Sequence, residues 1–201
     1  MTPSSDPTRA RKLALRDQLV TSRGRRPLLE VARAADAIAD LLLATPELRR
    51  AATVAAYVSI GTEPGTGVLL DRLRESGRRV LLPVLLPDWD LDWAVYEGAR
   101  SLAPARAGLL EPRGPRLGPD AVATADAVLT PGLAVDSRGM RLGKGGGCYD
   151  RALARVPVGT FVCTLLYDEE LVERVPSAEH DRPVTAVVTP AGLTRLRPAA
   201  T

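Results

Sequence analysis

Four short, largely apolar runs limit what this chain can fold into more than any other feature. The runs are Thr53–Ile60, Ala127–Thr130, Val158–Tyr167 and Ala186–Thr189. Strands that are apolar throughout are buried on both faces, as parallel strands are beneath two layers of helices. The sequence therefore predicts an α/β fold, with a mostly parallel sheet flanked by helices on both faces.

Helical patterns separate these runs. Apolar residues recur every three or four positions from Leu28 to Leu42, which predicts an amphipathic helix that Pro46 is expected to end. Residues 99–119 are rich in Pro, Gly and Arg without a clear period, which is typical of a surface segment. The expected helices cover residues 9–22, 28–44, 68–75 and 149–155, and further strands cover 79–86, interrupted by Pro83, and 91–96.

Length and composition narrow the class of protein. With 201 residues, one domain over residues 9–195 is expected, with flexible ends at residues 1–8 and 196–201. A net charge of +3 and 3% aromatic residues argue against nucleic-acid binding. Two cysteines, no secretory leader and no apolar run of about 20 residues predict a cytoplasmic protein that does not enter a membrane. We expect a monomer or a weak dimer.

A glycine-rich segment gives the clearest indication of a binding site. Five glycines fall within Gly139–Gly147, interleaved with Arg138, Arg141 and Lys144, and Asp150 follows closely. Glycines allow successive backbone N–H groups to point at one anion, the basic side chains add positive charge, and the carboxylate can hold a divalent metal. A nucleoside triphosphate is the expected ligand. Neither the Walker A spacing nor the dinucleotide fingerprint is satisfied.

The segment instead reads Pro-Gly-x-x-x-Asp-x-x-Gly-x-Arg-x-Gly-x-Gly-x-Gly-x-Tyr-Asp from Pro131 to Asp150. This pattern closely resembles the signature of the 5-formyltetrahydrofolate cyclo-ligase family, also called methenyltetrahydrofolate synthetases. Four further segments resemble the family in the same order, so that the similarity spans residues 12–190. They are Lys12–Arg16, Tyr57–Glu63, Gly108–Pro112 and Glu179–Pro183.

The resemblance implies a single cyclo-ligase-like domain that binds two small substrates, ATP and a reduced folate. The implied reaction converts 5-formyltetrahydrofolate to 5,10-methenyltetrahydrofolate and releases ADP and phosphate. The γ-phosphoryl group moves to the formyl oxygen, which activates the formyl carbon for attack by N10 of the folate. The protein's task is alignment and neutralisation of phosphate charge.

The resemblance also implies roles for individual residues. The catalytic cations are Lys12, Arg16, Arg141 and Lys144. Asp150 and Asp181 match magnesium ligands. ATP is held by Lys12, Arg16, Arg141, Leu142, Gly143, Lys144, Gly145, Gly146, Gly147, Cys148 and Tyr149; the folate is held by Arg16, Val58, Glu63, Lys144, Gly145, Gly146, Gly147 and Cys148.

Several positions leave alternatives open. Cys148 stands where the family usually has a tyrosine, which predicts a weaker hydrogen bond at that point. His180, the only histidine, is interpreted as a loop residue. Trp93 is interpreted as a core residue, with a position beside the folate as the alternative. Two other functions remain: a non-catalytic folate- or nucleotide-binding module on the same fold, and a sugar-phosphate enzyme of similar α/β architecture.

Overall fold

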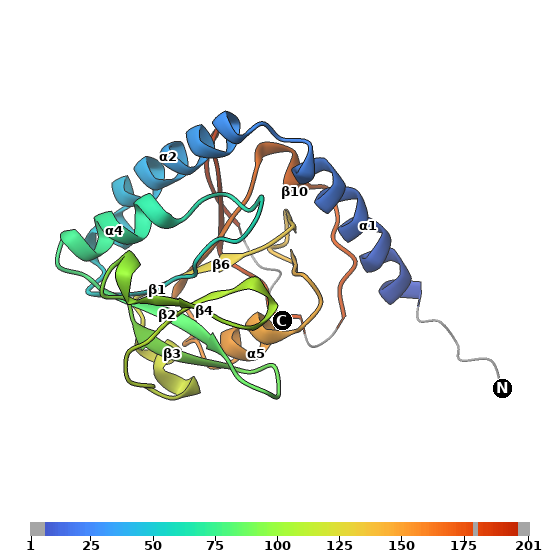
Figure 1. Ribbon diagram of the computed structural model, residues 1–201. Helices are drawn as coiled ribbons and strands as arrows, with labels where there is room; N and C mark the ends of the chain where they lie inside the picture. The colour runs from blue at the N-terminus through green and yellow to red at the C-terminus, as the bar shows by residue number, and fades with distance from the viewer. Residues whose placement is uncertain (1–6, 179–180, 197–201) are drawn as a thin grey trace.

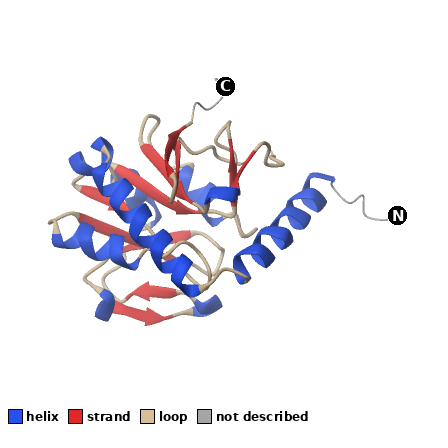
Figure 2. Ribbon diagram, turned by 90° about the horizontal axis from the view of Figure 1, so that it is seen from above, coloured by secondary structure: helices blue, strands red, loops and turns tan. Residues whose placement is uncertain are grey.

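The computed structural model describes residues 7–178 and 181–196 and centres on a seven-stranded sheet. Figures 1 and 2 show the sheet between helices on its two faces. The strand order is β12-β11-β9-β6-β1-β2-β3, in which the five middle strands run parallel and the two edge strands run antiparallel. The mostly parallel sheet expected from the sequence is confirmed. The strands are β1 (Thr53–Ala55), β2 (Arg79–Leu85), β3 (Leu91–Val95), β6 (Ala127–Pro131), β9 (Phe161–Leu165), β11 (Ala186–Thr189) and β12 (Gly192–Arg195).

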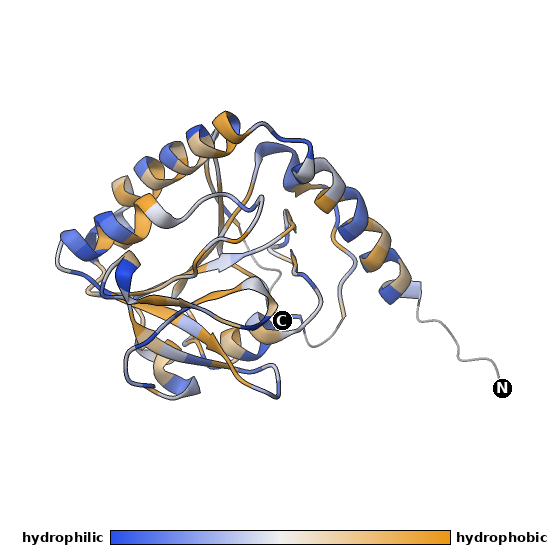
Figure 3. Ribbon diagram, viewed as in Figure 1, coloured by the Kyte–Doolittle hydropathy of each residue, from blue (hydrophilic) through white to orange (hydrophobic). Residues whose placement is uncertain are grey.

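Consecutive residues of the central strands enter two different cores, which explains why these runs are apolar throughout. Val54 and Leu129 pack in one cluster, while Ala55 and Val128 pack in another on the opposite face. Figure 3 shows the mostly hydrophobic strands beneath the helices. The first cluster lies under α2 (Leu28–Ala44), α3 (Pro46–Arg50) and α4 (Gly67–Glu75); the second lies under α5 (Cys148–Leu153) and the 3-10 helix η3 (Pro119–Thr124).

Two prolines stand where the sequence predicts a break, and only one of them acts as predicted. The helix α2 ends at Ala44, just before Pro46, as expected; Pro46 then opens α3, because Thr45 accepts a hydrogen bond from the Leu48 N–H at 3.3 Å and caps the new helix. Pro83 does not interrupt β2. Strand β1 pairs with β2 only as far as Leu81, so the missing N–H of Pro83 removes no bond between these two strands.

Short elements that the sequence does not predict complete the fold. β10, β7 and β8 form a second sheet, and the surface segment 99–119 contains a small hairpin made of β4 and β5. The strand expected over residues 53–60 ends at Ala55, after which the chain leaves the sheet. The added elements are β4 (Leu102–Pro104), β5 (Leu110–Pro112), β7 (Ala134–Asp136), β8 (Arg141–Leu142), β10 (Leu171–Val172), η1 (Ala99–Ser101) and η2 (Arg106–Gly108). The 3-10 helix η4 (Asp168–Glu170) lies within residues 168–174, where the sequence predicts a helical turn or two.

Helix α1 (Pro7–Gly24) lies along one side of the molecule and is held near its end by a buried ion pair (Figure 1). The Arg23 guanidinium donates to both carboxylate oxygens of Glu170, at 2.6 and 2.7 Å, and to the carbonyl of Gly132 at 2.7 Å. Leu19 of the same helix packs against Leu133 in a third apolar cluster. These contacts fix the direction in which α1 leaves the domain.

Some expectations fall outside the described residues. Most of the expected flexible ends lie outside the described residues; only residues 7 and 8, which start α1, and residue 196 are described. His180 also lies outside them. Across residues 7–178 and 181–196, no helix is both long and apolar enough to cross a membrane.

The Arg23–Glu170 pair yields a stability prediction. Replacing Arg23 by Met leaves the Glu170 carboxylate buried without its cation, which is expected to lower the free energy of unfolding by about 3–5 kcal/mol. Arg195→Met breaks the exposed Arg195–Glu47 pair and serves as the control, with an expected loss below about 1 kcal/mol. Urea unfolding of both variants measures the difference, and equal losses would contradict the proposed anchoring.

Candidate functional site

A pocket of about 800 Å³ lies beyond the carboxyl ends of β1, β2 and β6. β1 and β6 are neighbours at the centre of the sheet. From this point the strand order runs in opposite directions, to β2 beyond β1 and to β9 beyond β6. Such a reversal of strand order leaves a crevice in which α/β proteins bind ligands. Tyr57 and Val58 enter the pocket just after β1, and Pro131 and Gly132 do so at the end of β6.

The glycine-rich loop lies between β8 and α5 and forms one wall of the pocket. Gly145 and Gly147 adopt positive φ values of 107° and 68°, a conformation that residues with a side chain rarely adopt. Gly139 has a different role, since a Cβ there would lie 2.3 Å from the Val184 carbonyl oxygen. It permits close backbone packing at the base of the loop.

Asp136 holds the turn that precedes the loop. Its buried carboxylate accepts hydrogen bonds from the backbone N–H groups of Arg138, Met140 and Val175 at 3.0–3.1 Å and from the Arg138 guanidinium at 2.7 Å. Burial alone raises the pKa of this carboxyl, but the hydrogen bonds outweigh it and hold the pKa below its usual value. The aspartate of the motif is therefore a structural residue.

Three ion pairs join the predicted phosphate-binding cations to the predicted acidic ligands. Lys12 Nζ lies 2.6 Å from Asp181 Oδ2, and Lys144 Nζ lies 2.7 Å from Glu63 Oε1. Arg141 Nη2 lies 3.2 Å from Asp150 Oδ1.

The fourth predicted cation, Arg16, donates from Nε to the carbonyl of Gly143 at 2.8 Å. Every side chain in these contacts lines the pocket, which gathers all the residues predicted for the site. Those residues are Lys12, Arg16, Val58, Glu63, Arg141, Leu142, Gly143, Lys144, Gly145, Gly146, Gly147, Cys148, Tyr149, Asp150 and Asp181.

The acidic residues suit a metal that is only partly held by protein. Among residues 7–178 and 181–196 there is no group of three or more His, Cys, Asp or Glu side chains that could hold an ion alone. Asp150 and Asp181 nevertheless line the same pocket. Mg²⁺ commonly takes one or two carboxylates and fills its remaining positions with phosphate oxygens and water, so this pair of residues fits such an ion.

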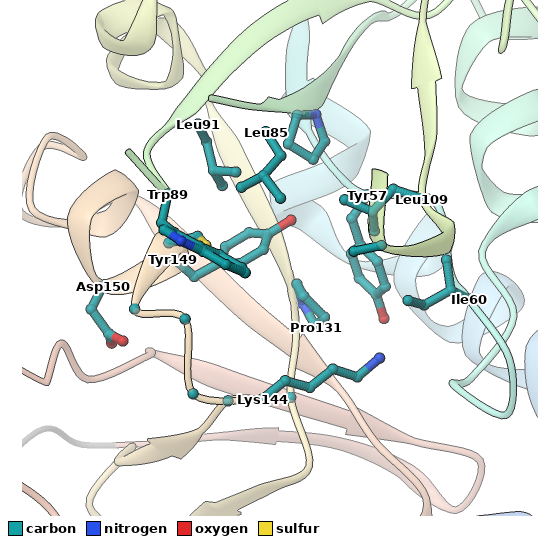
Figure 4. Close-up of a pocket in the computed structure, with 18 of the residues that line it drawn as sticks. Tyr57, Ile60, Leu85, Trp89, Leu91, Leu109, Pro131, Lys144, Tyr149 and Asp150 are labelled. Carbon is teal, nitrogen blue, oxygen red and sulfur yellow. The ribbon is translucent and has the colours of Figure 1, made fainter. Parts of the chain in front are cut away.

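The remaining wall of the pocket is apolar and was missed by the sequence prediction. Figure 4 shows Leu85, Trp89 and Leu91 together along one side of the pocket and Lys144 across from them, with Asp150 on the side of Trp89. Trp93, the tryptophan considered for folate contact, is fully buried in the core. The core interpretation of Trp93 is confirmed, and Trp89 is the tryptophan that reaches the pocket.

Two tyrosines and the unusual cysteine complete the lining. The hydroxyls of Tyr57 and Tyr149 are buried and make no hydrogen bond to the part of the chain that the structure describes. Burial raises the pKa of both phenols. Cys148 is half-buried, and burial likewise raises the pKa of its thiol. All three groups are neutral at neutral pH.

Comparison with known proteins agrees with this geometry. Residues 8–190 match the model of the 5-formyltetrahydrofolate cyclo-ligase family. The chain belongs to this family. It is thus a ligase of the folate-dependent one-carbon metabolism class, as the sequence motif predicted.

Relatives and solved structures cover most of the chain. A 5-formyltetrahydrofolate cyclo-ligase of Mycolicibacterium smegmatis is 43% identical over 151 residues, which are 72% of this chain and 77% of the relative. One of Escherichia coli K12 is 36% identical over 160 residues, 76% of this chain and 85% of the relative. The solution structure of the Aquifex aeolicus 5,10-methenyltetrahydrofolate synthetase superposes with a TM-score of 0.80 at 28% identity, covering 94% of this chain and 95% of that one.

The Asp136 carboxylate yields a prediction about pH. Because its pKa is lowered on folding, the stability that it contributes is fully present well above the unfolded value of about 3.9 and is lost as the pH falls toward its folded pKa. Asp136→Asn is therefore expected to be less stable than the original chain at pH 7. Below about pH 4 the difference should shrink. Thermal unfolding of both proteins from pH 7 to pH 3 measures it, and a pH-independent difference would contradict the role of the charge.

Proposed function

We propose that this protein converts 5-formyltetrahydrofolate to 5,10-methenyltetrahydrofolate at the expense of ATP, with release of ADP and phosphate. The observation that carries the proposal is the gathering of Lys12, Arg141 and Lys144, each paired with an acid, around one pocket. Family membership supplies the reaction class.

The proposed reaction requires the protein to align ATP and the folate, and it requires no covalent intermediate with the protein. The formyl carbon on N5 is amide-like and a poor electrophile. Transfer of the γ-phosphoryl group of ATP to the formyl oxygen turns that oxygen into a leaving group and releases ADP. N10 of the folate then attacks the carbon and loses its proton to water, the C–O bond breaks, and the oxygen departs with phosphate. Such a reaction depends on positioning and on neutralising phosphate charge.

The nucleotide side of the site is proposed to consist of the cations and the glycine-rich loop. Lys12, Arg16, Arg141 and Lys144 bind the phosphate oxygens, and the backbone N–H groups of residues 143–147 add further donors. The residues from Leu142 to Tyr149 line this part of the pocket and are proposed to enclose the nucleotide. Three of these cations already neutralise a carboxylate, so the ATP phosphates would replace that carboxylate as the counter-charge.

Asp150 and Asp181 are proposed to hold Mg²⁺, since both line the pocket beside these cations. When bound, the metal neutralises phosphate charge and orients the transferred group. When Arg141 and Lys12 turn to the phosphates, Asp150 and Asp181 each lose the cation of one ion pair. A divalent ion supplies the charge that each needs, so the exchange of partners is balanced.

The folate side is proposed to centre on Glu63 and Val58. Glu63 is nearly buried, with one carboxylate oxygen paired with Lys144 and the other accepting the Ile60 N–H at 2.9 Å. Once Lys144 turns to phosphate, the first oxygen is available to accept a hydrogen bond from a ring N–H of the pterin. We propose that both substrates are contacted by a shared set of residues that line the same pocket: Arg16, Lys144, Gly145, Gly146, Gly147 and Cys148.

The two alternative functions have less support. Membership of a ligase family argues against a non-catalytic module. A sugar monophosphate needs neither two acids for a metal nor an apolar wall. A cytoplasmic location and a monomer or weak dimer remain predictions.

The activity assay tests the proposal directly. With 5-formyltetrahydrofolate, Mg²⁺ and ATP, micromolar protein should produce the near-ultraviolet absorbance of the methenyl product. Omitting Mg²⁺ or ATP should abolish the signal because the phosphate charge is then uncompensated or the phosphoryl donor is absent. If the complete mixture shows no change in absorbance, the proposal is wrong.

A further inference from the structure

Trp89 is an exposed aromatic residue in an unusual place. Its side chain lines the pocket while the residue remains 52% exposed, although tryptophan is usually well buried. It belongs to the turn between β2 and β3, where Leu86 and Asp90 pair through a backbone bond of 2.9 Å. A large apolar surface left open inside a pocket is typical of a binding position.

The backbone of Trp89 is strained. Its φ is +67°, the left-handed conformation that a three-residue hairpin loop requires at its last position and that glycine adopts most easily. A bulky residue with this conformation is an outlier, and such outliers concentrate at functional sites. If the residue only had to form the turn, glycine would adopt this conformation with less strain.

Neighbouring groups hold the ring in position. Arg151 donates to the Trp89 carbonyl at 2.6 Å and to the Gly146 carbonyl at 3.0 Å, and thereby ties the turn to the glycine-rich loop. A Cβ on Gly146 would lie 3.2 Å from the indole ring. The Arg106 guanidinium lies 5.7 Å from the ring centroid and donates to the Leu86 carbonyl.

The two ends of the glycine-rich loop have different surroundings. Gly143 and Gly145 lie against Arg16, whereas Gly146 lies against Trp89. Leu85 and Leu91 extend the apolar wall around Trp89, across the pocket from Lys144 (Figure 4). A phosphate chain that follows Lys144, Arg16 and Lys12 leads toward α1 and away from this wall.

From this arrangement we infer that Trp89 is a specificity-determining residue whose indole face packs against the aminobenzoyl ring of the reduced folate. The inference rests on the proposed function. A pterin at Glu63 leaves the aromatic middle of the folate to follow the apolar wall. A flat ring stacked on tryptophan gains dispersion and offset-stacking energy at little cost in side-chain entropy.

Replacement of Trp89 by Gly separates binding from folding. Glycine relieves the backbone strain, so the melting temperature should stay the same or rise, whereas the KM for 5-formyltetrahydrofolate should rise about ten-fold, within the range for loss of an aromatic stacking platform. The KM for ATP should change less than two-fold. Trp89→Phe keeps a flat ring and should restore most of the folate affinity. Asp88→Gly loosens the same turn without removing the ring and should leave both KM values within two-fold.

Fluorescence tests the contact without turnover. The chain has two tryptophans, so the difference between the original chain and Trp89→Phe reports Trp89, and the buried Trp93 corrects for absorption by the ligand. The folate alone should quench the Trp89 signal, and ATP alone should not. Quenching by ATP only, or equal rises in both KM values for Trp89→Gly, would overturn the inference. If the activity assay fails but the folate still quenches Trp89, the proposed reaction is wrong and the binding contact stands.

Discussion

The buried ion pair between Arg23 and Glu170 connects the parts that build the site. Arg23 anchors the end of α1, the helix that carries Lys12 and Arg16, and it also holds the carbonyl of Gly132 at the start of the segment after β6. Glu170 accepts the N–H of Tyr167 at 2.9 Å, and the Tyr167 hydroxyl donates to the Thr62 carbonyl beside Glu63. One network therefore reaches α1, the floor of the pocket and the turn that carries Glu63.

The charges of the pocket neutralise each other in pairs. A cation beside an acid avoids the cost of leaving either charge uncompensated in a partly buried site. The proposed substrates and metal offer a replacement for each partner: phosphate oxygens for the lysines and Arg141, a divalent ion for Asp150 and Asp181, and ring N–H groups for Glu63. The ion pairs thus order the side chains of the pocket while these groups remain available for exchange.

The sequence predicts the features that depend on local pattern. The amphipathic helix over residues 28–44 and the central parallel strands follow from apolar spacing, because that spacing records which faces are buried. The two- and three-residue strands β8, β10 and β7 have no such pattern, since distant pairing creates them. Pro83 was misinterpreted because the end of a neighbouring strand decides its effect. Pro46 ends the preceding helix as predicted, but the helix α3 that it opens depends on capping by Thr45.

The residues predicted for the site all line one pocket, but their pairing could not be predicted, and their roles stay predictions. The family resemblance named part of the pocket lining, yet it could not reveal that Lys12 pairs with Asp181 across 169 positions of sequence. Trp89 lies outside the motif, and its importance appears only in its backbone conformation and its exposure to the pocket. Asp136 lies within the motif, but its partners show that it holds a turn.

The exchange of charge partners is the central claim, and a crystal structure with Mg²⁺, a non-hydrolysable ATP analogue and the folate tests it most directly. We predict that Lys12, Arg141 and Lys144 contact phosphate oxygens in that complex, that Asp150 and Asp181 coordinate the metal, and that Glu63 accepts a pterin N–H. A complex in which the three ion pairs persist and the nucleotide binds elsewhere would contradict the account.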